Sequence, residues 1–173
     1  MIGGLIQAAL AFPSPNGQPY VTLPISLQVP ALLLTALVCG PRSAMLAGVA
    51  YISLDLFQLP VFHAGGGMAY LMDPGFGYVA GFLPAAWVTG RLARQQGMDN
   101  CVSLAGAACM GLAVLQACGI TNLLLGGLVQ RWGGGLPGLL INYSLGPIVP
   151  QLMLCCAIAV LALPLRRLLL VES

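Results

Sequence analysis

Lysine is absent from this sequence, and charge of either sign is scarce. The acids are Asp55, Asp73, Asp99 and Glu172, and charged residues make up only 6% of the 173 positions. A soluble domain carries about a quarter charged residues, so this composition cannot build a water-facing surface. The net charge of +2 is also too small and too scattered for nucleic-acid binding. The composition therefore indicates an integral membrane protein.

Groups that carry out enzyme chemistry are equally sparse. Hydrolysis or phosphoryl transfer needs a nucleophile–base pair or a metal cage, and a single histidine, His63, without any lysine supplies neither. The cysteines lie within apolar runs and form no C-x-x-C pair, which is typical of small buried hydrophobes. No phosphate-binding loop pattern occurs. We therefore expect no enzyme, no cofactor and no metal site, and any energy coupling must come from a partner or a gradient.

Long apolar runs are what the sequence has in abundance, with 59% hydrophobic residues. A bilayer crossing takes about 20 apolar residues, and lipid leaves the helix as the solution for such runs. We expect an all-α membrane protein, with residues 1–173 forming a single bundle of six transmembrane helices. Because the first segment lacks a basic start and a cleavage motif, we expect it to be a crossing rather than a removed signal peptide. The expected helices are about Met1–Phe12, Ile25–Cys39, Ser43–Leu59, Phe76–Ala93, Cys101–Val129 and Leu139–Leu170.

The arginines predict the orientation of this bundle. If the N-terminus is cytoplasmic, the turns after the second, fourth and sixth helices are cytoplasmic as well, and only Arg131 falls on the other side. This bias predicts that both termini are cytoplasmic and that the two glycine-rich loops are extracellular. The arginines on the cytoplasmic side are Arg42, Arg91, Arg94, Arg166 and Arg167.

The most unusual stretch is LPVFHAGGGMAYLMDPGFGYVAGF, residues 59–82. It is long, nearly uncharged and rich in glycine, whereas a plain connection between membrane helices needs only a few polar residues. Permissive backbone of this kind suits a loop that closely approaches a ligand. We therefore expect its glycines to contribute to a binding site: Gly65, Gly66, Gly67, Gly75 and Gly77.

Polar residues near the expected outer helix ends extend this candidate site. Hydroxyl and amide side chains can donate and accept hydrogen bonds, and backbone amides at the start of the fourth helix favour an anionic group. Such a set suits a small, flat, largely uncharged ligand. Asp55 lies within the third helix, where an acid implies a partner or a water-lined cavity, although a hydrated position at the interface is an equal alternative. The polar candidates are Gln28, Tyr70, Asp73, Tyr78, Asn142 and Gln151.

Three stretches resemble the BioY family, the biotin-specific S components of energy-coupling-factor (ECF) transporters. They are VTLPISLQVPALLLTALVCGPRSA (Val21–Ala44), the run ending LPVFHAGGG (Tyr51–Gly67) and DPGFGYVAGF (Asp73–Phe82). The resemblance implies a multi-pass protein of the bacterial plasma membrane that binds biotin near the extracellular side and mediates its uptake. It also implies two kinds of partner, a transmembrane coupling subunit and ABC ATPases that supply the missing ATP site.

One departure from the family concerns the start of the last helix. Members commonly carry Pro-Gly-Asp-x-x-Lys there, and the best counterpart here, Pro150 to Cys155, has neither charge. Two alternatives therefore stay open beside a biotin-binding subunit. One is an S component for another small vitamin-like ligand, and the other is a structural subunit of a membrane complex that binds no small molecule.

Overall fold

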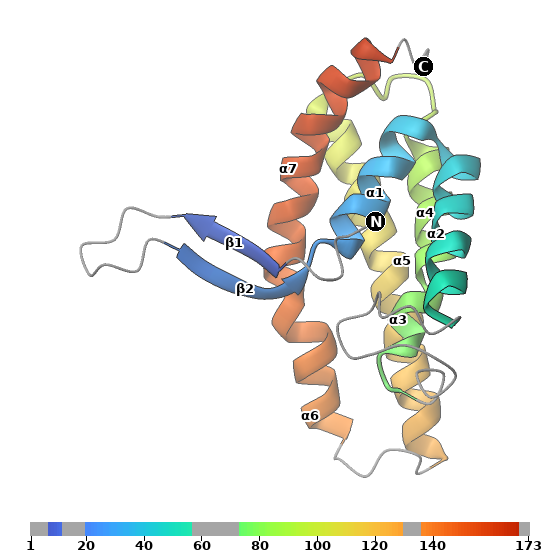
Figure 1. Cartoon of the computed structure of the whole chain (residues 1–173), viewed down its shortest axis with the longest axis vertical. Helices are drawn as coiled ribbons and strands as arrows, with labels where there is room; N and C mark the ends of the chain where they lie inside the picture. Colours follow the sequence, from blue (N-terminus) through green and yellow to red (C-terminus); the bar gives the residue numbers. More distant parts are fainter. Residues whose placement is uncertain (1–6, 12–19, 57–72, 130–135, 170–173) are drawn as a thin grey trace.

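Helices make up most of the described chain (Figure 1). The structure is a computed structural model that describes residues 7–11, 20–56, 73–129 and 136–169, without the side chains of residues 7–11, 20–26, 55, 56 and 136. Helices are found in each segment where one was expected from Ile25 onward, but the expected helix Phe76–Ala93 is divided at Gly81 into two. The expected ends at Leu59 and Leu170 lie outside the described residues. The helices are α1 (Gln28–Cys39), α2 (Pro41–Leu56), α3 (Phe76–Ala80), α4 (Phe82–Leu92), α5 (Cys101–Leu128), α6 (Leu136–Leu140) and α7 (Gly146–Leu168).

The helix expected at the start of the chain is wrong over its described part. Gln7–Ala11 forms a strand, β1, which pairs antiparallel with β2 (Tyr20–Ser26) and places Leu10 opposite Val21. Pro24 within β2 has no N–H for a helical hydrogen bond, and the β-branched residues around it favour extended backbone. β2 is therefore extended and pairs with β1. The helix α1 begins after β2, at Gln28 rather than at Ile25. The predicted cytoplasmic N-terminus concerns Met1–Ile6, which lie outside the described residues.

The interior of the bundle is made by α1 and α5, with α2, α4 and α7 around them (Figure 1). Leu32, Leu33 and Leu104 are completely buried in this core. Small residues bring the helices close together, since a Cβ added at Gly111 of α5 would collide with the hydroxyl of Thr89 on α4. The contact between α4 and α5 therefore depends on the absence of a side chain at Gly111.

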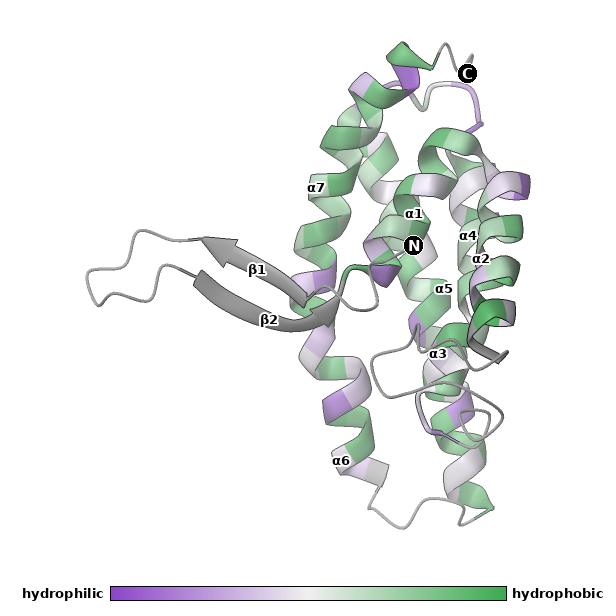
Figure 2. Cartoon of the chain, in the orientation of Figure 1, coloured by the Kyte–Doolittle hydropathy of each residue, from purple (hydrophilic) through white to green (hydrophobic). Residues whose placement is uncertain are grey.

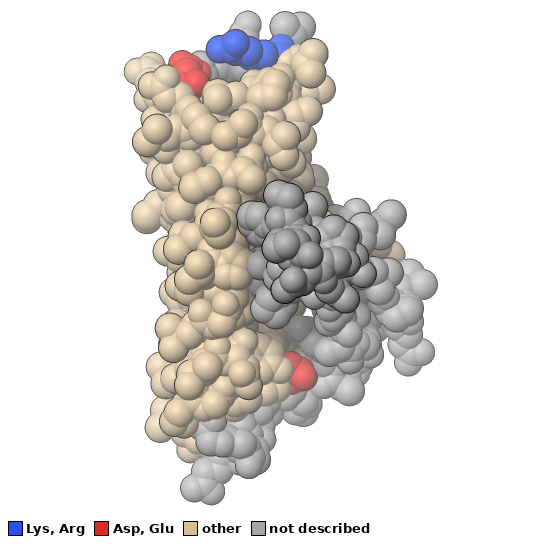
Figure 3. Space-filling model, turned by 90° about the vertical axis from the view of Figure 1, so that its left-hand side faces the viewer, with Lys and Arg blue, Asp and Glu red and all other residues tan. Residues whose placement is uncertain are grey.

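The outer surface of the helices is apolar, as lipid requires. Cys101–Leu128 and Pro137–Leu168 are long and apolar enough to cross a membrane, with mean hydropathies of 1.8 and 2.3. Large apolar side chains such as Val102, Met153 and Val160 are exposed on them. Hydrophobic residues dominate the described helices (Figure 2), and on the face in Figure 3 the charged side chains lie toward the two ends of the molecule. These features fit a bundle embedded in a bilayer.

The last helix contains a π-helical turn at Ile141–Leu145, between α6 and α7. The N–H of Gly146 donates to the carbonyl of Ile141, five residues earlier. The α-helical hydrogen-bond pattern is interrupted here because Pro147 has no N–H to donate to the carbonyl of Tyr143, four residues before it. Such turns are frequent at functional sites, and this one presents Tyr143 and Ser144 toward neighbouring helices.

Candidate binding site

Three neutral polar side chains form a hydrogen-bonded chain between α5 and the last helix. The Ser144 hydroxyl donates to Oε1 of Gln116 at 3.0 Å, and Nε2 of Gln116 donates to Oε1 of Gln151 at 3.1 Å. Gln116 and Ser144 are only 6% and 5% exposed. Burying an amide between membrane helices is unfavourable unless it is hydrogen-bonded. These two hydrogen bonds therefore fix how α5 and α7 face each other.

An aromatic pair lies beside these amides. The ring of Tyr78 on α3 stacks with that of Tyr143, with centroids 6.3 Å apart and an interplanar angle of 21°. The same ring lies directly over Gly119, where an added Cβ would collide with it. The Tyr78 hydroxyl is buried and has no hydrogen-bond partner among the described residues, although Ser144 is its polar neighbour. A buried hydroxyl without a partner is available for a ligand.

Glycines and one asparagine hold α3 against α5. A Cβ at Gly77 would collide with the Cβ of Asn122, so the two backbones approach as closely as glycine allows. Nδ2 of Asn122 donates to the Pro74 carbonyl at 3.2 Å, and the Gly75 N–H donates to Oδ1 of Asp73 at 2.7 Å. The Asp73 carboxylate therefore stabilises the turn that leads into α3. These contacts hold the Tyr78 ring against α5, at Gly119.

A second polar contact joins the start of α1 to α2. The Gln28 amide donates to the hydroxyl of Tyr51, a residue that is 3% exposed. The Tyr51 ring lies 6.2 Å from that of Phe82 at the start of α4. Gln28 therefore belongs to a buried contact among three helices, α1, α2 and α4.

The structure brings together part of the candidate set from the sequence. Tyr78 and Gln151 approach the same buried amide chain, while Asp73, Gly75 and Gly77 build the turn and helix that carry Tyr78. Asn142 is exposed on the π-helical turn. The remaining candidates, Gly65, Gly66, Gly67 and Tyr70, lie outside the described residues, as does the side chain of Asp55.

Sequence reasoning missed Gln116 and Asn122. Both lie in the middle of the apolar run LAVLQACGITNLLL, where neither neighbours nor spacing mark them. The available signal was their rarity, because an uncharged amide within a membrane helix is costly unless it pairs across helices. Gln116 makes two such bonds.

The chemistry of this cluster is neutral. Amide and hydroxyl groups offer both donors and acceptors, and the tyrosine rings offer flat apolar faces. The Asp73 carboxylate, at the edge of the cluster, accepts a hydrogen bond from the Gly75 N–H. Such a site can hold a small polar ring by hydrogen bonds and stacking, without charge pairing.

Known proteins are similar to this chain in sequence and in fold. It is 31% identical over 105 residues to the probable biotin transporter BioY of Lysinibacillus sphaericus, covering 61% of this chain and 54% of that protein. It is 35% identical to the biotin transporter BioY of Thermotoga maritima, covering 59% and 60%. The matched stretch thus spans between half and two thirds of the length of these two relatives.

A solved structure and a family profile extend the comparison. The crystal structure of the S-component for biotin from an ECF-type ABC transporter has a TM-score of 0.69 to this chain at 19% identity. That match covers 85% of this chain and 78% of the other, and at this identity it shows a shared fold. The profile of the BioY family matches residues 2–170, so the chain belongs to the BioY family.

Proposed function

We propose that this protein is a membrane subunit that captures biotin on the extracellular side and mediates its uptake. Membership of the BioY family over residues 2–170 carries this proposal. The neutral cluster of Gln116, Ser144, Gln151 and Tyr78 supports it, because its chemistry suits the ligand. The chain acts as a binding subunit rather than an enzyme, since the sequence offers no catalytic set.

Biotin presents a ureido ring with one carbonyl acceptor and two N–H donors, a thioether ring and a carboxylate tail. In this proposal the amides of Gln116 and Gln151, which bond to each other in the free protein, exchange bonds with the ureido group, and the Tyr78 hydroxyl adds a donor. The stacked rings of Tyr78 and Tyr143 offer aromatic surface to the thioether sulfur. In this proposal Gly65, Gly66, Gly67 and Tyr70 cover the ligand, and Asn142 and Gln28 lie at its edge.

The arginine-rich end of the bundle is cytoplasmic in this proposal. Arg91 and Arg94 at the end of α4, Arg42 at the start of α2 and Arg166 near the end of α7 lie at one end of the structure, which agrees with the positive-inside pattern. The candidate site lies toward the other end, on the extracellular side of a bacterial plasma membrane. The protein then works as one multi-pass transmembrane domain with a cytoplasmic C-terminus. A cytoplasmic N-terminus stays a prediction, because Gln7–Ala11 forms a strand rather than the expected crossing.

The sequence has no ATP-binding loop, so the energy for transport must come from a partner or from a gradient. We infer that an ECF transmembrane coupling subunit and ABC ATPases supply the energy. Co-expression with and without such a module, followed by uptake of radiolabelled biotin, tests this step. Calorimetric titration of the purified chain with biotin tests capture alone, so a failure of the partners and a failure of binding are distinguishable.

A further inference from the structure

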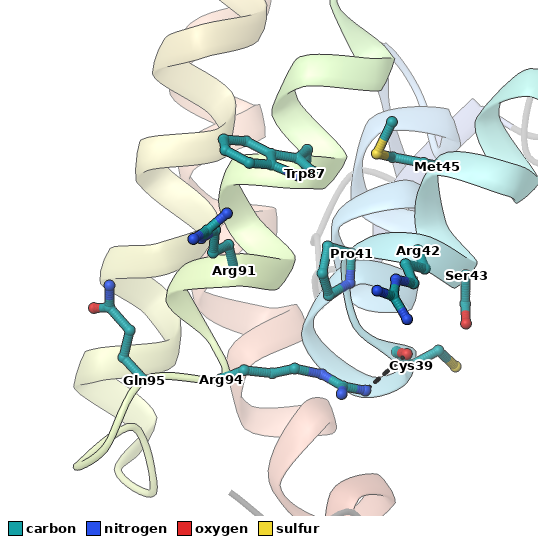
Figure 4. A pocket seen from close by; sticks show the side chains of 9 residues that line it. All are labelled: Cys39, Pro41, Arg42, Ser43, Met45, Trp87, Arg91, Arg94 and Gln95. Atoms are coloured by element: carbon teal, nitrogen blue, oxygen red, sulfur yellow. Dashed lines mark hydrogen bonds between the residues drawn. The ribbon is translucent and has the colours of Figure 1, made fainter.

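A concave basic pocket lies at the opposite end from the candidate site, between the start of α2 and the end of α4 (Figure 4). Its volume is about 820 Å³, and its lining includes Arg42, Arg91 and Arg94. Figure 4 shows the side chains of all three arginines among those that line the pocket. None of these residues belongs to the proposed biotin site.

The three arginines differ from the structural arginine at the same end. Arg166 is 6% exposed and donates to the carbonyls of Met98 and Ala93, both at 3.0 Å. In the pocket, Arg94 makes one bond of 3.2 Å to the Cys39 carbonyl, and Arg91 lies 5.1 Å from the centroid of the Trp87 ring. Within the described part of the chain, no carboxylate pairs with the pocket arginines. Their positive charge is therefore open to an anion.

The apolar and charged side chains of the pocket lie at different levels along the bundle. Trp87 precedes Arg91 by one helical turn on α4, and Met45 follows Arg42 by about one turn on α2. The apolar side chains thus lie on the bundle side of the arginines and Arg94 lies on the loop side (Figure 4). Tryptophan favours the headgroup level of a bilayer, which places the arginines at the depth of lipid phosphates.

We propose that this pocket binds the phosphate group of an anionic phospholipid from the cytoplasmic leaflet. Arg42 and Arg91 contact the phosphate, while Trp87 and Met45 contact the glycerol and the first acyl carbons. A free phosphate shares the charge but has no apolar part to fill the inner side of the pocket. Basic pockets between helices on the cytoplasmic side are suited to such headgroups. This proposal does not depend on the identity of the transported ligand.

The test uses the purified full-length chain in detergent. It carries Trp132→Phe, so that Trp87 is the only remaining tryptophan. Tryptophan fluorescence is followed on titration with micelles containing phosphatidylglycerol, with phosphatidylcholine micelles, or with inorganic phosphate at equal phosphate concentration. The variant is Arg42→Gln/Arg91→Gln, which keeps the Arg94 bond. The control is Arg167→Gln, an exposed arginine at the same end that does not line the pocket.

We expect phosphatidylglycerol to bind, phosphatidylcholine and inorganic phosphate to bind far more weakly, and the double variant to lose about 30-fold in phosphatidylglycerol affinity. The control should bind like the parent. Native mass spectrometry of the same samples should show retained phosphatidylglycerol in the parent and not in the double variant. Unchanged affinity in the double variant, equal binding of both lipids, or inorganic phosphate binding as tightly as phosphatidylglycerol would each overturn the proposal.

Discussion

The side-chain amide of Gln116 on α5 donates a hydrogen bond of 3.1 Å to that of Gln151 on α7, inside the bundle. Gln116 also accepts a hydrogen bond from the Ser144 hydroxyl. The last helix carries neither acid nor lysine in the stretch from Pro150 to Cys155. Recognition of a ligand here must therefore rest on amides, a hydroxyl and stacked rings.

Replacing Gln116 with leucine should weaken biotin binding by 10- to 100-fold. The substitution keeps the volume but removes the partner of both Ser144 and Gln151, and an unsatisfied buried polar group costs about 1–3 kcal/mol. Calorimetric titration measures the effect. Thr121→Val on the same helix is the control, since it removes only a local bond to the Ala117 carbonyl. Parental affinity in Gln116→Leu would show that the amide chain is not part of the site.

Gly119→Ala should disrupt binding, whereas Gly106→Ala should not. The new methyl at Gly119 collides with the Tyr78 ring, but at Gly106 nothing lies within 4 Å. Overpacking of this kind costs about 1–3 kcal/mol, while an unobstructed alanine stabilises a helix by roughly 0.5–1 kcal/mol. Thermal unfolding and biotin titration of both variants provide the measurement. Equal behaviour of the two would contradict the placement of Tyr78.

Tyr78→Phe separates ligand binding from folding. The Tyr78 hydroxyl is buried without a hydrogen-bond partner among the described residues, so its removal should leave the unfolding temperature of the free protein unchanged or slightly higher. A hydroxyl that bonds only to the ligand should cost about tenfold in biotin affinity when it is removed. A large drop in the unfolding temperature without biotin would mean that the hydroxyl has a structural role instead.

Replacing Arg166 with methionine should destabilise the bundle. The variant loses two charge-assisted bonds and leaves the carbonyls of Met98 and Ala93 without this donor. A loss of about 2 kcal/mol would lower the unfolding temperature by roughly 4–8 °C. Arg167→Met is the matched control because Arg167 is exposed. If both variants unfold at the same temperature, Arg166 does not stabilise the loop before α5.

Much of the helical fold could be predicted because lipid restricts the choices. The apolar run of α5 ended within one residue of its expected boundary, at Leu128 rather than Val129. The strand pair escaped prediction because QAALA at Gln7–Ala11 is compatible with a helix by local propensity. Only pairing with the proline-containing β2, a tertiary contact, makes it extended.

The candidate site was only partly predictable for a related reason. Tyr78 and Gln151 stand out because they follow glycine- or proline-rich sequence. Gln116 gains its role from partners 28 and 35 residues away, on another helix, and local sequence does not encode such a contact. The π-helical turn likewise depends on Pro147, whose effect falls on the carbonyl four residues earlier.

The absence of lysine predicts an unusual tolerance for changes in the biotin tail. No lysine can pair with the carboxylate, so if the neutral cluster dominates recognition, biotinamide should bind within a fewfold of biotin itself. Desthiobiotin, which keeps the ureido group but lacks the sulfur, should bind more weakly because it loses contact with the aromatic rings. Competition against radiolabelled biotin compares the three. A strong preference for the free carboxylate would show that a charge, rather than the amide chain, dominates recognition.

The most direct test of biotin capture is a calorimetric titration of the purified chain with biotin, without partner subunits and with riboflavin and thiamine as comparison ligands. The proposal predicts saturable one-to-one binding of biotin and none of the other two vitamins. Absence of binding at micromolar biotin, or preference for another vitamin, would contradict it.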